Sequence, residues 1–182
     1  MRMNAIAEIR EKLARFLAPK REFLRFSAIE GGLPKGALVE FSGQAGSGKT
    51  ETILRFLAQN PEVRVAWVEE NFTIYPCAFP QAGVGLDRVL FVETGSVELL
   101  WSVNQILRSQ IFGVVVLVAK EQNVIALRRL QIEAEKAGAT VILVAETAQQ
   151  IGNWPISLQL EFAREAEVAV FKILRRKGEL AV

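Results

Sequence analysis

The chain has 182 residues, of which 51% are hydrophobic and 23% charged, enough for one domain with a core and too few for two ordinary domains. Its 22 basic and 20 acidic residues leave a net charge of +2, so no overall basic excess indicates nucleic-acid binding. Histidine is absent and Cys77 is the only cysteine. This composition excludes His-ligated metals, His-dependent nucleophiles, an internal disulfide and a multi-cysteine zinc site.

The first residues combine a basic charge with a helical pattern. Residues 4–18 carry apolar side chains at helical spacing between charged ones, which predicts an amphipathic helix that ends at Pro19. Residues 1–25 hold seven basic and three acidic side chains, a local charge of +4. Two interpretations stay open: a solvated helix packed on the core, or a docking arm for a partner or a neighbouring subunit. We predict an N-terminal arm over residues 1–25 and a core over residues 26–182.

Apolar runs in the chain are short. The longest covers about nine residues, 111–119, whereas a membrane helix needs roughly 20. The N-terminal segment has charges spread through its apolar positions, unlike the uninterrupted apolar stretch of a signal peptide. We therefore expect a cytoplasmic protein with no membrane contact.

Strand and helix patterns alternate after a glycine-rich turn at residues 31–36. The patterns predict strands at 37–42, 63–69 and 89–92, buried strands at 114–119 and 140–145, and helices at 49–58, 97–109 and 124–136. Such alternation is typical of an α/β fold with a mainly parallel sheet. The last residues differ, because two strand patterns at 157–162 and 168–174 are joined by a polar link over 163–167. They predict a closing antiparallel hairpin at the C-terminus.

Residues 43–50 match the phosphate-loop pattern G-x-x-x-x-G-K-[ST] in full. A strand is predicted before them and an amphipathic helix after them, which is the context that the pattern requires. Glycines let backbone N–H groups turn towards phosphate oxygens, and the helix N-terminus adds partial positive charge. Lys49 is expected to reach the β- and γ-phosphates, and the Thr50 hydroxyl to ligate Mg²⁺. The sequence predicts a site for ATP or ADP with Mg²⁺, formed by Gly43, Gln44, Ala45, Gly46, Ser47, Gly48, Lys49 and Thr50.

The residues around this loop resemble the RecA recombinase family. Residues 31–43 are similar to the G-G-[ILF]-P-x-G-x-[LIV]-[VT]-E pattern that precedes the loop in that family, and residues 82–90 are similar to its A-x-G-V-D-x-x-x-L stretch. More specifically, the chain resembles the ImuA (SulA-like) accessory proteins of bacterial translesion synthesis at residues 65–68, 75–76, 99–101, 154–160 and 172–178. The resemblance implies a RecA-like P-loop core with an N-terminal helix.

The chain departs from the catalytic residues that the resemblance implies. RecA-type ATPases end their third core strand with an aspartate that holds Mg²⁺ through water, and this position falls near Val118. Their catalytic glutamate falls at Asn71, with Glu69 and Glu70 beside it. Glu70 is a candidate base if the strand end shifts by one residue, and the alternative is that both glutamates form a solvated strand end. With Mg²⁺ held by Thr50 and phosphate oxygens alone, we expect slow ATP hydrolysis or none.

Two other features of RecA-like proteins can be compared with this sequence: the DNA-binding loops and a basic pair at the end of the last strand. The DNA-binding loops of RecA correspond to residues 120–123 and 147–154, which are neither long nor basic enough to follow a phosphate backbone. Direct DNA binding is therefore expected to be weak or indirect.

RecA-like assemblies of the KaiC type end the last strand with a basic-x-basic pair that reaches the γ-phosphate of the adjacent subunit. Arg175 and Lys177 match this spacing as candidate trans fingers, the alternative being a solvated strand end.

The resemblance to ImuA implies a role in the DNA damage (SOS) response. The chain would be a nucleotide-binding adaptor for error-prone translesion DNA synthesis, with weak or no ATP hydrolysis. Its expected partners are error-prone DNA polymerase components, and the N-terminal helix is a second expected contact, through which a homo-oligomer would form. Two alternatives stay open: an active RecA-type DNA-dependent ATPase, and a SulA-like regulator of cell division.

Overall fold

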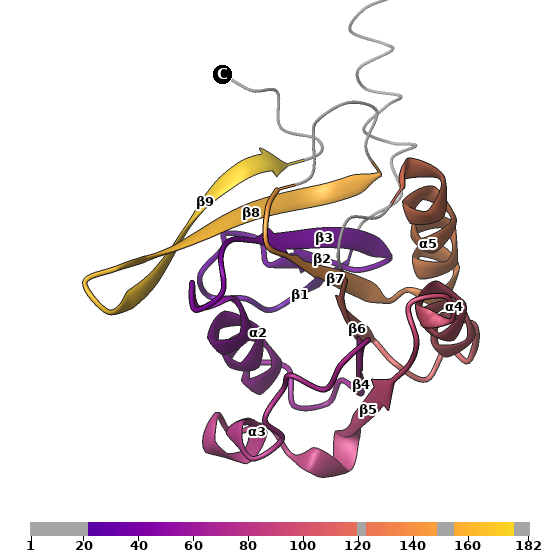
Figure 1. Cartoon of the computed structure of the whole chain (residues 1–182), viewed down its shortest axis with the longest axis horizontal. Coiled ribbons are helices and arrows are strands. Elements are labelled where there is room, and N and C mark those ends of the chain that lie inside the picture. The colour runs from indigo at the N-terminus through magenta and orange to yellow at the C-terminus, as the bar shows by residue number, and fades with distance from the viewer. Residues whose placement is uncertain (1–21, 120–122, 149–154, 177–182) are drawn as a thin grey trace, which may run out of the picture.

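A seven-stranded sheet forms the centre of the protein (Figure 1). The computed structural model describes residues 22–119, 123–148 and 155–176. The strand order is β5-β4-β6-β7-β3-β8-β9, and every adjacent pair is parallel except β8 with β9. The predicted α/β fold, with a mainly parallel sheet and a C-terminal antiparallel hairpin, is confirmed. The predicted N-terminal helix lies outside the described residues.

The elements follow each other as the alternating patterns predict. In chain order they are β1 (Phe23–Leu24), β2 (Leu33–Pro34), β3 (Ala37–Ser42), α2 (Lys49–Ala58), β4 (Val65–Glu69), α3 (Ala78–Gln81), a 3-10 turn (Leu86–Arg88), β5 (Val89–Glu93), α4 (Leu99–Arg108), β6 (Val114–Val118), α5 (Val124–Ala137), β7 (Thr140–Ala145), β8 (Ile156–Glu165) and β9 (Val168–Arg176). The predicted bounds of β3, α2 and β7 are confirmed residue for residue. Gly138, at φ 65°, ends α5 as expected of a C-terminal glycine cap.

The glycine-rich turn predicted at 31–36 contains a short strand that the sequence patterns did not reveal. Leu33 pairs antiparallel with Leu24, and both side chains are buried. Asn60 fastens the same segment, because its Oδ1 accepts from the Arg25 backbone N–H at 3.1 Å and its Nδ2 donates to the Arg25 carbonyl at 2.7 Å. The predicted boundary after residue 25 therefore falls within a segment that packs on the core.

The C-terminal hairpin is longer than predicted. Its two strands are joined by Ala166 and Glu167 alone, so the link predicted over residues 163–167 was wrong. Both turn residues have positive φ, 46° and 67°. Two-residue hairpin turns favour this conformation because its twist matches that of the flanking strands. The extended hairpin runs past the rest of the sheet (Figure 1), and its strands pass directly beside the loop that follows β3.

Helices cover both faces of the sheet (Figure 1). On one face Ile53, Phe56 and Leu57 of α2 belong to an apolar cluster with β3, β4 and β6. On the other face residues of α4 and α5, among them Leu107 and Leu127, form a second cluster against the same sheet. Burial on both faces explains why the strands read as continuous apolar runs. No helix within the described ranges is long and apolar enough to cross a membrane.

Candidate nucleotide-binding site

The phosphate loop joins β3 to α2 at the edge where the parallel strands end. In open α/β sheets, ligands bind at this carboxyl edge. Gly43, Gly46 and Gly48 have φ values of 145°, 78° and 94°, a region that residues with a side chain rarely adopt. A Cβ at Gly43 would lie 2.5 Å from the Phe162 carbonyl oxygen, and one at Gly48 would lie 2.3 Å from the Ala169 Cβ. The hairpin thus closes one side of the loop.

The other side of the loop is open among the described residues. Apart from the chain neighbours of Gly46, none of their heavy atoms lies within 4 Å of the position that a Cβ would take at Gly46. Gly48, at the start of α2, gives the helix no side-chain cap, so its first N–H groups remain directed out of the helix end. Open space next to a helix N-terminus with unoccupied N–H groups is the arrangement that binds a phosphate.

Lys49 places its ammonium group inside the loop. Its Nζ donates to the carbonyl oxygens of Gly43 and of Gln44, the latter at 2.9 Å, and lies 3.5 Å from the Ser47 hydroxyl. Partial burial lowers the pKa of Lys49 below its ordinary value, and the nearby Glu146 carboxylate opposes this shift. The cation is held among oxygen acceptors at the place where phosphate oxygens would take over these contacts.

Thr50 fits the role of a magnesium ligand. It lies in the first turn of α2, directly after Lys49, and its side chain is exposed. Mg²⁺ prefers oxygen ligands and keeps several waters, so one hydroxyl together with phosphate oxygens suits it. In the part of the chain that the structure describes, no group of three or more acidic, Cys or His side chains forms a metal site of its own. The loop therefore fits a nucleotide phosphate chain with Mg²⁺, held through Thr50.

The end of β6 has no acidic side chain. Val118 ends the strand, paired with Glu69 of β4 on one side and Val144 of β7 on the other. Val118 is thus the last residue of the strand at whose end the resemblance to RecA predicts an aspartate. An isopropyl group neither ligates a metal nor orders a water, so this strand offers Mg²⁺ no ligand.

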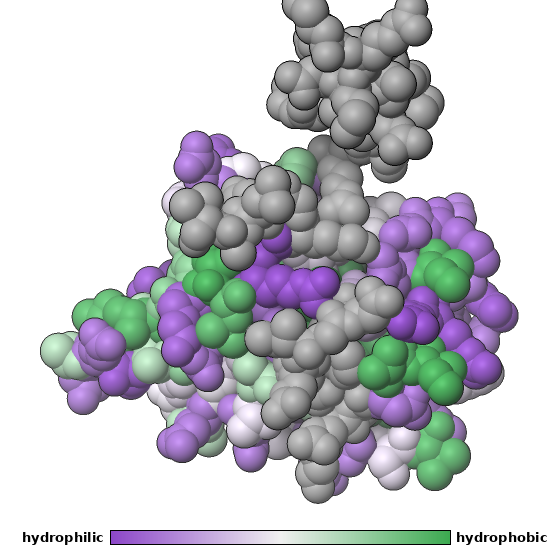
Figure 2. All heavy atoms as spheres, turned by 90° about the horizontal axis from the view of Figure 1, so that it is seen from above, coloured by the Kyte–Doolittle hydropathy of each residue, from purple (hydrophilic) through white to green (hydrophobic). Residues whose placement is uncertain are grey.

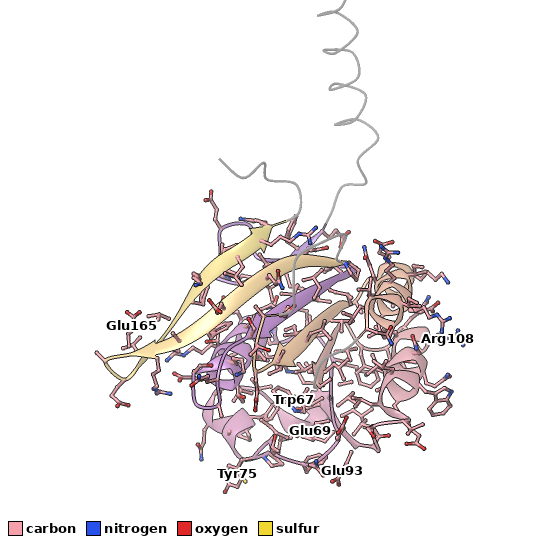
Figure 3. All side chains as sticks on the ribbon, turned by 45° about the horizontal axis from the view of Figure 1, so that its top comes forward. Trp67, Glu69, Tyr75, Glu93, Arg108 and Glu165 are labelled. Carbon is pink, nitrogen blue, oxygen red and sulfur yellow. The ribbon has the colours of Figure 1, made fainter. Side chains whose placement is uncertain are left out.

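Glu69 and Glu70 differ in their surroundings. Glu69 lies beside Glu93 at the ends of β4 and β5 (Figure 3), and only 1% of its surface is exposed. Its Oε2 accepts from the Thr73 hydroxyl at 2.7 Å and its Oε1 accepts from the Ile74 N–H at 3.1 Å. The interpretation of Glu69 as part of a solvated strand end is therefore wrong. Its carboxylate instead holds the turn that follows β4.

Glu70 remains the candidate base at the end of β4. It is half-buried and comes directly after the strand. Two strands, β6 and β7, separate β4 from β3. At about 4.8 Å per strand, the end of β4 lies about 14 Å from the end of β3. Whether Glu70 reaches a bound nucleotide stays a prediction.

Arg175 does not lie beside the phosphate loop of its own chain. It pairs with Gln159 of β8, which in turn pairs with Glu40 in the middle of β3. Contact between Arg175 and a nucleotide would therefore have to be made with a neighbouring subunit, as a trans finger requires. Lys177 lies outside the described residues.

The two reduced DNA loops are only partly described. Residues 120–122 and 149–154 lie outside the described ranges. Asn123, which the sequence placed in the first loop, is the N-cap of α5, because its Oδ1 accepts from the Ala126 N–H at 2.8 Å.

Two residues that lie at the phosphate loop were not predicted from the sequence. Arg164 of β8 donates from Nη1 to the Gly46 carbonyl at 3.2 Å and from Nη2 to the Glu167 carbonyl at 3.1 Å. Glu146 follows β7, and the Gly43 N–H donates to the carbonyls of Ala145 and Glu146, each at 3.2 Å. Glu146 could have been identified from the sequence, since it follows a predicted buried strand at the sheet edge that carries the phosphate loop. No sequence pattern indicates Arg164, because only the fold brings the hairpin to the loop.

The sheet and its helices have a RecA-like fold, and the sequence of the loop is that of a P-loop. A solved structure of the RadB recombinase matches 86% of this chain and 91% of its own with a TM-score of 0.70, at 16% sequence identity. The RecA protein of Synechococcus elongatus is 34% identical over 127 residues, and that of Nostoc punctiforme is 29% identical over 150 residues. No protein-family model matches the chain.

The similarity to RecA covers most of this chain but a minor part of RecA. The matched residues make up 68% of this chain and 35% of the Synechococcus protein, and 69% of this chain and 42% of the Nostoc protein. The chain thus spans about a third of the length of the curated relatives that it matches.

Proposed function

We propose that the chain is a nucleotide-binding RecA-like accessory protein in DNA repair, which binds ATP or ADP with Mg²⁺ and hydrolyses ATP slowly or not at all. One combination of observations carries the proposal: a complete phosphate loop stands beside a β6 strand that ends in Val118. The loop, Lys49 and Thr50 supply binding. The acid that would fix Mg²⁺ and stabilise developing charge during hydrolysis is not at its place.

A hydrolysis assay tests this proposal against the active DNA-dependent ATPase. The chain should bind ATP in a calorimetric titration, yet turn it over far below the enzyme median of about 10 s⁻¹, with and without single-stranded DNA. Val118→Asp places a carboxylate at the end of β6 and should raise the rate. Turnover near the median, or strong stimulation by DNA, would support the ATPase instead, and Glu70→Gln would then show whether Glu70 is its base.

The finer assignment, an adaptor in translesion synthesis, rests on the residues that resemble ImuA. Apolar side chains that remain exposed on α4 and α5 support binding to another protein: Trp101, Ile125 and Ile132. Figure 2 shows apolar surface gathered on this side of the molecule as well as on the hairpin. The proposed partners are error-prone DNA polymerase components in the cytoplasm, together with a homo-oligomer formed through the N-terminal arm.

A pull-down comparing polymerase components with cell-division proteins tests the adaptor against the SulA-like regulator. The full chain should retain polymerase components and not division proteins. A second chain lacks residues 1–21 and keeps Leu24 and Arg25, which contact the core. Its melting curve checks that the core folds without the arm. This chain should lose the partner or, in light scattering, the mass of the oligomer. Retention of division proteins alone would favour the regulator, and an unchanged partner and mass would exclude the arm as a docking segment.

A further inference from the structure

Glu146 is held beside the first residue of the phosphate loop. Strand β7 pairs with β3 up to Ser42 and Ala145, so Gly43 and Glu146 leave the sheet at the same level. The Gly43 N–H reinforces this by donating to the carbonyls of both Ala145 and Glu146 at 3.2 Å. The backbone of Glu146 is therefore fixed, while its side chain is exposed at the rim of the loop.

The charge of Glu146 acts on the cation of the loop. Its carboxylate interacts electrostatically with the Lys49 ammonium, whose Nζ is bonded to the Gly43 carbonyl. The strand on the other side of β3 offers a comparison. Glu161 of β8 pairs with Ser42 in the strand register, but its Oε2 lies 2.6 Å from the Lys172 Nζ. Each neighbour of β3 thus brings one glutamate to this edge, and of the two it is Glu146 that acts on Lys49.

Binding of a nucleotide changes what Glu146 faces. When phosphate oxygens take over the contacts of Lys49, the carboxylate stands near a polyphosphate of several negative charges instead of a cation. Like charges at such separations repel, most strongly where the protein excludes water. A divalent cation placed between the Glu146 carboxylate and the phosphates attracts both. The repulsion between carboxylate and nucleotide is then replaced by a net attraction through the cation.

We propose that Glu146 makes nucleotide binding at this loop depend on Mg²⁺, supplying at the end of β7 the acidic side chain that the end of β6 does not have. Strand β7 lies between β6 and β3, so Glu146 is one strand nearer to the loop than Val118. The proposal rests on the proposed nucleotide binding and extends it to a residue outside the phosphate-loop pattern. It concerns affinity and needs no hydrolysis.

The experiment is a titration of ADP and ATP onto the full chain, in Mg²⁺ and in excess chelator. Wild type is expected to bind at least tenfold more weakly in chelator. Glu146→Gln should bind roughly three- to tenfold more tightly than wild type in chelator, as removal of one nearby like charge predicts, and its dependence on Mg²⁺ should shrink by at least the same factor. Glu161→Gln removes the same charge from the opposite strand and should behave as wild type.

The outcomes separate this inference from the proposed function. If wild type binds neither nucleotide under either condition, nucleotide binding itself is wrong. If wild type binds and Glu146→Gln keeps the wild-type ratio between Mg²⁺ and chelator, the role of Glu146 is refuted while nucleotide binding stands. An equal change in Glu161→Gln would also refute it, because net charge would then be the cause. Melting curves of both variants check that they stay folded, as expected for replacements at exposed Glu146 and half-buried Glu161.

Discussion

Lys49→Ala is expected to lower the affinity for ATP and ADP by roughly ten- to a hundredfold, the equivalent of one charge-assisted contact worth about 1.5–3 kcal/mol. Lys49 is the side-chain cation that the loop itself encloses, and it is held by the carbonyls of Gly43 and Gln44. Alanine removes that positive charge and leaves the glycines and the helix N-terminus in place. A calorimetric titration with each nucleotide measures the loss.

The matched control for this variant is Lys35→Ala. Lys35 lies away from the loop and its Nζ forms an exposed ion pair with Glu22 at 3.0 Å, a type of contact that contributes little. It should bind nucleotide as wild type does. Equal affinities of Lys49→Ala and Lys35→Ala would show that Lys49 does not contact the phosphates. A melting curve of each variant distinguishes loss of the cation from loss of the loop's shape.

The position of the nucleotide site could be predicted from sequence because its signals are local. The G-x-x-x-x-G-K-[ST] pattern lies between a strand and a helix, and the bounds of both follow from neighbouring residues. Lys49 begins α2 directly after a glycine in the left-handed region, and Asn60 followed by Pro61 stops it. Val118 could be placed for the same reason, since β6 is one continuous apolar run.

The surroundings of the site could not be predicted, because they depend on contacts between distant segments. Whether Glu69 is solvated or buried follows from the turn that folds back onto it through Thr73 and Ile74, and no spacing in the sequence reports that contact. Likewise, Ala163 and its neighbours were predicted as a polar link, whereas the observed strand continues past them and brings Arg164 to the loop.

Gly48→Ala is expected to destabilise the protein more than Gly46→Ala does. Alanine at φ 94° is strained by about 1–2 kcal/mol, and its Cβ would lie 2.3 Å from that of Ala169, an overlap that costs about 1–3 kcal/mol more. For a chain of this size the sum corresponds to a fall in Tm of roughly 5–15 °C. Nucleotide binding should fall as well, since β9 and the loop would be forced apart.

Gly46→Ala separates the two causes, because Gly46 has a similar φ of 78°, but beyond its chain neighbours no described atom lies within 4 Å of where its Cβ would be. The Gly46→Ala variant has the backbone strain without the steric overlap, so it should lower Tm by only about 2–6 °C. Combining Gly48→Ala with Ala169→Gly removes the overlap, so the double variant should melt above Gly48→Ala even though Ala169→Gly by itself weakens the strand. Equal melting temperatures for Gly46→Ala and Gly48→Ala would mean that the hairpin does not press on the loop. A positive coupling between residues 48 and 169 would instead establish that the hairpin, which no local pattern connects to the loop, forms one wall of the nucleotide site.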